Sequence, residues 1–153
     1  MAPFKSDKIT VTVSNNLMSL NRLHKVCESL IWDLPFAEKH RYFLMVALSE
    51  AYTNAFEHGN QKNPDTQIKL TFYVSEKYLK IVIEDEGIMP IQDTEVNLCN
   101  KSCPEDTGGR GLTLIKRIFD EAVFEHKADG TNQVTLISNF NTVSNEFFTV
   151  KER

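Results

Sequence analysis

Three groups of residues in this 153-residue sequence have the types and spacing needed for phosphate or metal chemistry. The first lies in "SEAYTNAFEH", where Glu50, Asn54 and His58 are spaced four apart and therefore form one column on a helix. Asn is a poor helix former, and Asn54 has no evident capping role in the middle of this run. The column is therefore a candidate ligand-facing surface, with an ordinary polar helix face as the alternative.

The other two groups follow later in the chain. "EDEG", residues 84–87, closes an alternating strand pattern, and an acidic turn would explain it equally well. "TGGRGL", residues 107–112, holds Gly108, Gly109 and Gly111, three of the six glycines, where a helix is predicted to begin. Unpaired N–H groups at a helix start, together with glycine, let phosphate oxygens approach the main chain. This third group predicts a phosphate site that is not a Walker A loop, since no G-x-x-x-x-G-K-[ST] occurs.

Hydrophobic periodicity predicts the elements that position these groups. Helices are expected from about 16 to 32, from Pro35 to Gly59, and from 108 to about 120, since apolar residues recur there at helical spacing. Alternating apolar residues predict strands over 8–13, 67–74, 78–85, 121–126 and 132–140. The segment from Asp85 to Thr107 has no periodicity, and a loop of this length is usually functional or disordered.

This order of elements predicts an α/β (α+β) two-layer sandwich, in which three helices cover one face of a mixed, mainly antiparallel sheet. One domain over 1–140 and a loose tail over 141–153 are expected. The other face of the sheet must then be partly polar, and alternate strand positions supply polar residues for it: Lys69, Thr71, Lys80, Thr135 and Ser138.

Composition narrows the function classes. The net charge of −4 gives no electrostatic reason to expect nucleic acid or an anionic membrane surface. No apolar run reaches the roughly 20 residues of a membrane span, and the first residues lack the apolar core of a signal peptide, so a cytoplasmic protein is expected. The sequence has three cysteines, an odd number, which would be thiols in a reducing compartment. Cys99 and Cys103 could supply two ligands of a metal site, which is the weaker alternative.

Together and in this order, the three groups resemble the N box and the two glycine boxes of the histidine-kinase-like ATPases. That superfamily, with its Bergerat ATP-binding fold, unites gyrase, heat-shock chaperones and sensor histidine kinases. Within it, "SEAYTNAFEHGN", "IEDEG" and "GGRGLTLIKRIFDE" are similar to the small serine/threonine kinases that act as bacterial anti-sigma factors. The resemblance runs from about residue 8 to 140.

The resemblance implies that the helix column faces ATP and Mg²⁺, so that Asn54 and His58 lie at the nucleotide. The oxygen of Asn54 would bind the metal, since Mg²⁺ takes oxygen ligands and keeps several waters. Glu50 would be the catalytic carboxylate that accepts a proton from, or orients, the attacking hydroxyl. Asp85 would accept a hydrogen bond from the adenine amine, and Gly87 would permit close approach of the base.

The remaining nucleotide contacts implied by the resemblance come from the third group and the last hairpin. Thr131 would help to close the adenine pocket, and residues 88–107 would form the ATP lid. The first glycine box departs from the usual D-x-G-x-G, because Met89 stands at the second glycine and could weaken nucleotide binding. The phosphates would be cradled by Gly108, Gly109, Gly111 and Leu112, with Arg110 as a charge partner.

Two function classes follow. As an enzyme, the protein would use ATP to phosphorylate a serine or threonine of a small antagonist protein and would hold a sigma factor inactive. As a binding module, it would sequester a protein partner with little or no turnover. Glu50 favours the enzyme and Met89 the module. The resemblance also implies pairing with a second copy through the first helix and the exposed part of the sheet, and places Arg22 as a partner contact. His24 lacks the helical hairpin of a histidine kinase, which disfavours that class.

Overall fold

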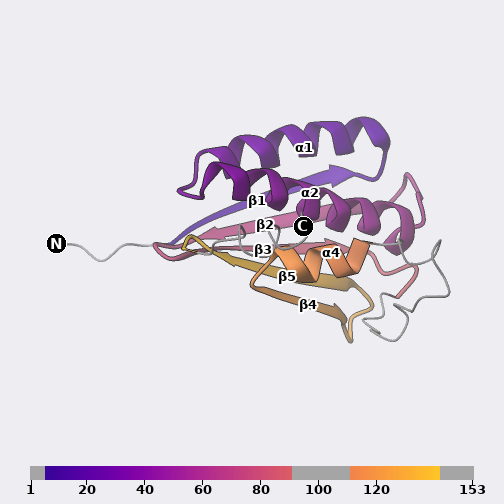
Figure 1. Ribbon diagram of the computed structural model, residues 1–153. Coiled ribbons are helices and arrows are strands. Elements are labelled where there is room, and N and C mark those ends of the chain that lie inside the picture. The colour runs from indigo at the N-terminus through magenta and orange to yellow at the C-terminus, as the bar shows by residue number, and fades with distance from the viewer. Residues whose placement is uncertain (1–5, 91–110, 142–153) are drawn as a thin grey trace, which may run out of the picture.

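A computed structural model describes residues 6–90 and 111–141 of the chain (Figure 1). Several predictions lie outside these described residues: the contacts of Gly108, Gly109 and Arg110, most of the expected lid, Cys99 and Cys103, and the tail after residue 141. The predictions for Gly111 and Leu112 lie inside them.

The sheet has five strands, which largely match the predicted ranges. Their order is β1-β2-β3-β5-β4, and each neighbouring pair is antiparallel. The strands are β1 (Asp7–Ser14), β2 (Gln67–Val74), β3 (Tyr78–Asp85), β4 (Glu121–His126) and β5 (Asn132–Asn139).

In residues 6–90 and 111–141, three α-helices cover one face of this sheet (Figure 1). They are α1 (Leu17–Trp32), α2 (Glu38–Asn54) and α4 (Leu112–Ile118), and α2 continues as a π-helical segment, η1 (Ala55–Gly59). Asn16 caps α1, since its side-chain oxygen accepts the Ser19 N–H at 2.8 Å. In the part of the chain that the structure describes, none of the helices has the length and apolar character needed to cross a membrane.

The predicted two-layer sandwich is confirmed, but the prediction of a mixed sheet was wrong for the described strands. Helices between strands usually return the chain for a parallel neighbour. Here two helices, α1 and α2, lie between the strands, so the chain reverses direction three times and β2 returns antiparallel to β1. After α4, β5 lies between β3 and β4 and separates the two strands that run the same way.

The core lies between the helices and the sheet. Its largest fully buried side chains include Phe72 and Leu70 of β2, Ile81 and Ile83 of β3, and Leu136 of β5. These are the alternate strand positions that the sequence predicted to be apolar. They fix which face of each strand is buried.

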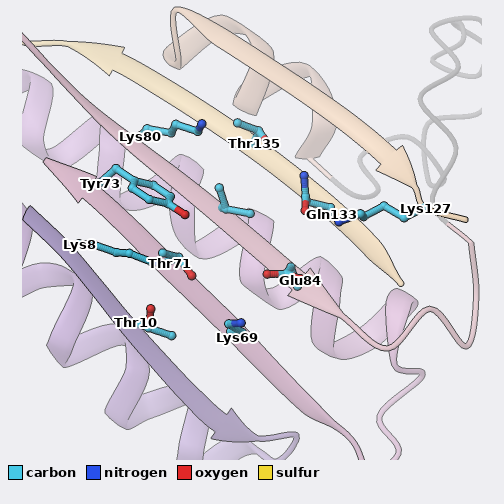
Figure 2. Close-up of a pocket in the computed structure, with 11 residues that line it drawn as sticks. Lys8, Thr10, Lys69, Thr71, Tyr73, Lys80, Glu84, Lys127, Gln133 and Thr135 are labelled. Carbon is cyan, nitrogen blue, oxygen red and sulfur yellow. Dashed lines mark hydrogen bonds between the residues drawn. The ribbon is translucent and has the colours of Figure 1, made fainter. Parts of the chain in front are cut away.

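The open face of the sheet is polar, as predicted (Figure 2). Lys69, Thr71, Lys80 and Thr135 lie on it. Placing Ser138 there was wrong, because successive strand residues point to opposite faces and Ser138 lies three positions after Thr135. Ser138 is fully buried on the helix side, where its hydroxyl lies 3.2 Å from Nε2 of the buried His40.

The second helix also begins later than predicted. Pro35 was expected to open it, but Ala37 is the N-cap residue and α2 starts at Glu38. The intervening residues instead form a turn, in which the N–H groups of Asp33 and Leu34 bond to the carbonyls of Leu30 and Ile31. Phe36 is buried beyond this turn, where it packs against Phe140 with ring centroids 5.0 Å apart.

A buried amide, Asn60, joins the end of the helix layer to the sheet. Its side-chain nitrogen donates to Asn15 Oδ1 at 3.1 Å and to the Gln67 carbonyl at 3.0 Å. Its oxygen accepts the Glu86 N–H at 2.8 Å. Asn60 therefore holds the starts of α1 and β2 and the end of β3 in one hydrogen-bonded unit.

Replacing this amide should destabilise the fold. Asn60→Ala leaves buried polar groups without partners, so the free energy of unfolding should fall by about 2–4 kcal/mol in urea titration. The matched control is Asn139→Ala at the exposed end of β5, which should change it by less than about 0.5 kcal/mol. Equal effects of the two changes would contradict this role for Asn60.

Candidate functional site

The π-helical segment brings the chain backbone against a buried carboxylate. Its wider turn is closed by the Asn60 N–H, which donates to the Ala55 carbonyl at 2.8 Å, five residues back. This turn carries Gly59 onto Asp85, and a Cβ at Gly59 would overlap the Asp85 carboxylate. Gly59 is therefore a site residue that the sequence suggested only as a helix stop.

The same segment interrupts the predicted polar column. Regular α-helical spacing joins Glu50 and Asn54, which are both half-buried, but it ends at Asn54. His58 lies in the π-helical turn, with its Nε2 at 4.0 Å from the Glu57 carboxylate and a side chain that is 43% exposed. The column expected from spacing alone is therefore continuous only for Glu50 and Asn54.

Asp85 ends β3 and is 6% exposed. The Gly87 N–H donates to its Oδ1 at 2.7 Å, and the side-chain nitrogen of Asn132 donates to the same oxygen at 2.9 Å. Among the described residues no hydrogen bond is recorded to Oδ2. Within the described residues, the carboxylate is thus held through its Oδ1 oxygen.

Burial raises the pKa of the Asp85 carboxyl to about 6, because desolvation disfavours the charged form. The two hydrogen bonds and the nearby His126 act in the opposite direction and lower the pKa, while Glu86 raises it. A raised carboxyl pKa in a built environment is typical of functional sites, although burial alone also produces it.

The sequence analysis did not identify Asn132 as a site residue. It is 1% exposed, and its side-chain nitrogen donates both to Asp85 and, at 2.9 Å, to the Met89 carbonyl. Its oxygen lies 2.8 Å from His126 Nδ1. The alternation of β5 could have indicated this, since residue 132 shares a face with the apolar positions 134 and 136.

Thr131, the predicted pocket residue, makes a different contact. Its hydroxyl donates to Asp129 Oδ1 at 2.7 Å, within the turn that joins β4 to β5. The Thr131 N–H donates to the same oxygen at 2.9 Å. In this structure the side chain that reaches Asp85 from the hairpin is therefore that of Asn132.

The backbone after Asp85 explains both Gly87 and Met89. Gly87 has a φ of +72°, and a Cβ there would overlap the Gly130 carbonyl of the hairpin turn. The Met89 N–H donates to the Gly59 carbonyl at 2.9 Å, and its carbonyl accepts from Asn132, so its backbone is held on both sides. Its side chain is 46% exposed, which places methionine bulk outside the packed part of the site.

The other end of the site joins α2 to the start of α4. Gly111, the N-cap of α4, has a φ of +52°, and a Cβ there would lie 3.0 Å from Cγ and Cδ of Glu50. The glycine therefore lets the chain that enters α4 pack directly on the Glu50 carboxylate. Leu112 follows as a buried anchor, 8% exposed.

The arrangement has two carboxylates with different surroundings. Asp85 is buried and held by donors beside Gly59 and Gly87. Glu50 is half-buried against the glycine that begins α4. A buried carboxylate can read a base amine, and a carboxylate beside a glycine-rich helix start can face phosphates or an attacking hydroxyl.

The fold is a two-layer α/β sandwich with two carboxylates at one end of its helix layer, and the family comparison assigns it. A model of the histidine kinase-like ATPase domain matches residues 13–138. The chain therefore belongs to the histidine kinase-like ATPase family, which confirms the resemblance inferred from the three sequence groups.

Individual relatives carry more specific names. The chain is 28% identical over 109 residues to the serine-protein kinase RsbW of Bacillus subtilis, covering 67% of this chain and 68% of that protein. It is 27% identical over 107 residues to the anti-sigma F factor of Bacillus cytotoxicus, covering 67% and 73%. With the serine-protein kinase RsbW of Bacillus licheniformis it shares 38% identity over 86 residues, covering 51% and 53%.

Two solved structures share the fold. The RsbU and RsbW domains of Rv1364c from Mycobacterium tuberculosis match at a TM-score of 0.60 and 16% identity, over 86% of this chain and 31% of that chain. The SiaB–SiaC complex from Pseudomonas aeruginosa matches at a TM-score of 0.57 and 12% identity, over 86% and 89%. At these identities the likeness supports the predicted architecture.

The raised pKa of Asp85 gives a pH dependence with a defined sign. The folded pKa of about 6 exceeds the ordinary aspartate pKa of 3.8, so the folded state binds a proton that the unfolded state releases. The stability that this group contributes therefore falls as pH rises from about 4 to 6. From about pH 4 to pH 7, the free energy of unfolding of the parent should fall by up to about 3 kcal/mol relative to Asp85→Asn. Parallel stability profiles, measured by urea unfolding at each pH, would contradict the shifted pKa.

Proposed function

We propose that this protein is an ATP-dependent serine/threonine protein kinase that acts as an anti-sigma factor in a partner-switching system. It would phosphorylate a small antagonist protein and hold a sigma factor inactive, in the cytoplasm where ATP is available. Membership of the ATPase family supports the nucleotide, and the names of the relatives support the kinase and anti-sigma roles. The observation that carries the proposal is Glu50 packed on Gly111 at the start of α4.

In this proposal Asp85 recognises the base. Its Oδ1 is occupied by Gly87 and Asn132, so Oδ2 accepts the exocyclic amine of adenine. Guanine presents a carbonyl oxygen at that position, which a carboxylate repels. Gly59 and Gly87 keep the surrounding backbone free of Cβ atoms at this point.

At the phosphate end, Glu50 orients the attacking hydroxyl and accepts its proton. Asn54, one turn further along α2, offers an amide oxygen of the kind that Mg²⁺ prefers. The bound metal would neutralise phosphate charge. Gly111 and Leu112, with Gly108, Gly109 and Arg110 before them, would surround the phosphates.

The alternative of a sequestering module rested on Met89. In the structure the Met89 backbone is hydrogen-bonded on both sides, and the residue is 46% exposed. The substitution therefore leaves the packed residues around Asp85 in place. It no longer favours the module over the kinase.

Base recognition by Asp85 predicts nucleotide selectivity. Calorimetry should detect Mg-ATP binding and much weaker Mg-GTP binding. Asp85→Asn should weaken ATP binding by about 1.5–3 kcal/mol, the value of a hydrogen bond to a charged group, whereas Asp65→Asn at an exposed position should not. Equal affinities for the two nucleotides in the parent would remove Asp85 from base recognition.

Glu50 and Asn54 should separate binding from turnover. Glu50→Gln should keep ATP affinity while phosphate transfer to the cognate antagonist falls by roughly 10²–10⁴, the range for a positioned acid or base. Asn54→Ala should lose magnesium-dependent affinity and transfer together. Glu28→Gln on the exposed side of α1 is the control and should change neither.

The same measurements decide between kinase and module. A parent protein that binds an antagonist and ATP but transfers no phosphate would replace the kinase with the sequestering module. Parental transfer by Glu50→Gln would keep the enzyme and assign its catalytic carboxylate elsewhere.

A further inference from the structure

The open face of the sheet carries a hollow of about 320 Å³ that the proposed kinase site does not use (Figure 2). It lies on the side of the sheet away from the helices. Four lysines line it, against a single carboxylate among the described residues: Lys8, Lys69, Lys80 and Lys127 against Glu84. The chain as a whole has a net charge of −4, so this face locally reverses the sign of the protein.

The lysines are held on this face by their neighbours. Lys8 and Lys80 lie over the Tyr73 ring, with Nζ atoms 5.8 and 5.2 Å from its centroid. The Nζ of Lys127 donates to Gln133 Oε1 at 3.3 Å. The positive groups therefore surround the hollow in an ordered arrangement.

The charged surface extends across the sheet. Lys8 belongs to β1 at one edge, and Lys127 follows β4 at the other. Four strand spacings of about 4.8 Å give a width of roughly 19 Å. This is wide enough for an α-helix, which is about 10–12 Å across with its side chains, to lie in the hollow.

We infer that this open face binds an acidic segment of a protein partner, whose Asp and Glu side chains lie against the lysines. The floor of the hollow offers the hydroxyls of Thr10, Thr71 and Thr135 as further polar contacts. The inference rests on the proposed function only in requiring a protein partner. Because the face is opposite the helix layer, the partner can bind without entering the nucleotide site.

The charge pattern also orients the partner. Glu121 and Glu125 of β4 pair directly with Ile137 and Gln133 of β5, and directly paired residues of antiparallel strands point the same way. Gln133 lies on the open face, so both glutamates lie there too. The surface is therefore basic over β1 to β3 and acidic along β4. An acidic segment binds over β1 to β3, and any basic residues that flank it meet β4.

Two other occupants fit the face less well. Tyr73 is the one aromatic side chain among the described residues that line the hollow, and two lysines already flank its ring, so single-stranded nucleic acid finds little stacking surface. A second copy that places its lysines of β1 to β3 over the same strands brings lysines against lysines. The pairing that the resemblance implies, through α1 and the exposed part of the sheet, is a separate outcome of the test.

The test uses the full chain and a defined probe. The probe is a fluorescent 18-residue helical peptide of Glu, Ala and Leu, compared with the same peptide carrying Lys for Glu and with an 18-nucleotide oligo-dT. Lys69→Gln combined with Lys80→Gln removes two charges from the open face. The matched control, Lys25→Gln combined with Lys39→Gln, removes two exposed charges from the helix layer.

The acidic peptide should bind the parent, bind the open-face variant about tenfold more weakly, and bind the control variant within about twofold of the parent. Added salt should weaken this binding, since the lysines are exposed to screening. Amide shifts in NMR spectra should change on β1, β2 and β3. Thermal unfolding and ATP affinity should be the same in all three proteins.

Several outcomes would overturn the inference. One is equal affinity of the open-face and control variants for the acidic peptide, and another is no binding of that peptide by the parent. A third is that the parent binds the oligonucleotide more tightly than the peptide and that the open-face variant no longer binds the oligonucleotide. A parent dimer that light scattering shows to dissociate in the open-face variant would assign the face to a second copy. Loss of ATP binding with peptide binding intact would refute the proposed function alone.

Discussion

The structure depends on one buried carboxylate. Asp85 has little access to water, so its charge is costly unless donors and a ligand surround it. Three elements meet to do this. The π-helical turn brings Gly59 against it, the segment after β3 contributes the Gly87 N–H, and β5 contributes the amide of Asn132.

These contacts also explain why the turn after α2 has its particular shape. A regular α-helix would continue the column of Glu50 and Asn54 through His58. The wider π-helical turn instead ends at a glycine whose missing Cβ lets the backbone approach Asp85. Asn60 then fixes this turn to both β2 and the residue after β3. The helix that carries Glu50 is thereby tied to the strand end that carries Asp85.

Much of the fold could be predicted, because its strands have one buried and one open face. Alternation in "QIKLTFYV" and "YLKIVIED" gave the ranges of β2 and β3 directly. The order of the strands in the sheet could not be predicted, since nothing in the local sequence indicates that β5 lies between β3 and β4. The π-helical turn was equally inaccessible, because its hydrogen bonding depends on tertiary contacts of Gly59 and Asn60.

The candidate site could be predicted only for residues that belong to short sequence motifs. Asp85 and Gly87 belong to one motif and lie together in the structure. Gly111 lies against Glu50, a contact between distant positions that the sequence alone could not establish. Motif matching singled out Thr131, whose side chain bonds within its own turn, and did not identify the neighbouring Asn132, which donates to Asp85. Strand alternation was the physical signal that a motif match did not use.

The central claim is that the free oxygen of Asp85 accepts the adenine amine. The direct test is a calorimetric cycle in which Mg-ATP and the triphosphate of purine riboside, which lacks that amine, are each titrated into the parent and into Asp85→Ala. The parent should prefer ATP by about tenfold or more, and the variant should bind the two nucleotides alike. A preference for ATP of the same size in both proteins would contradict the account.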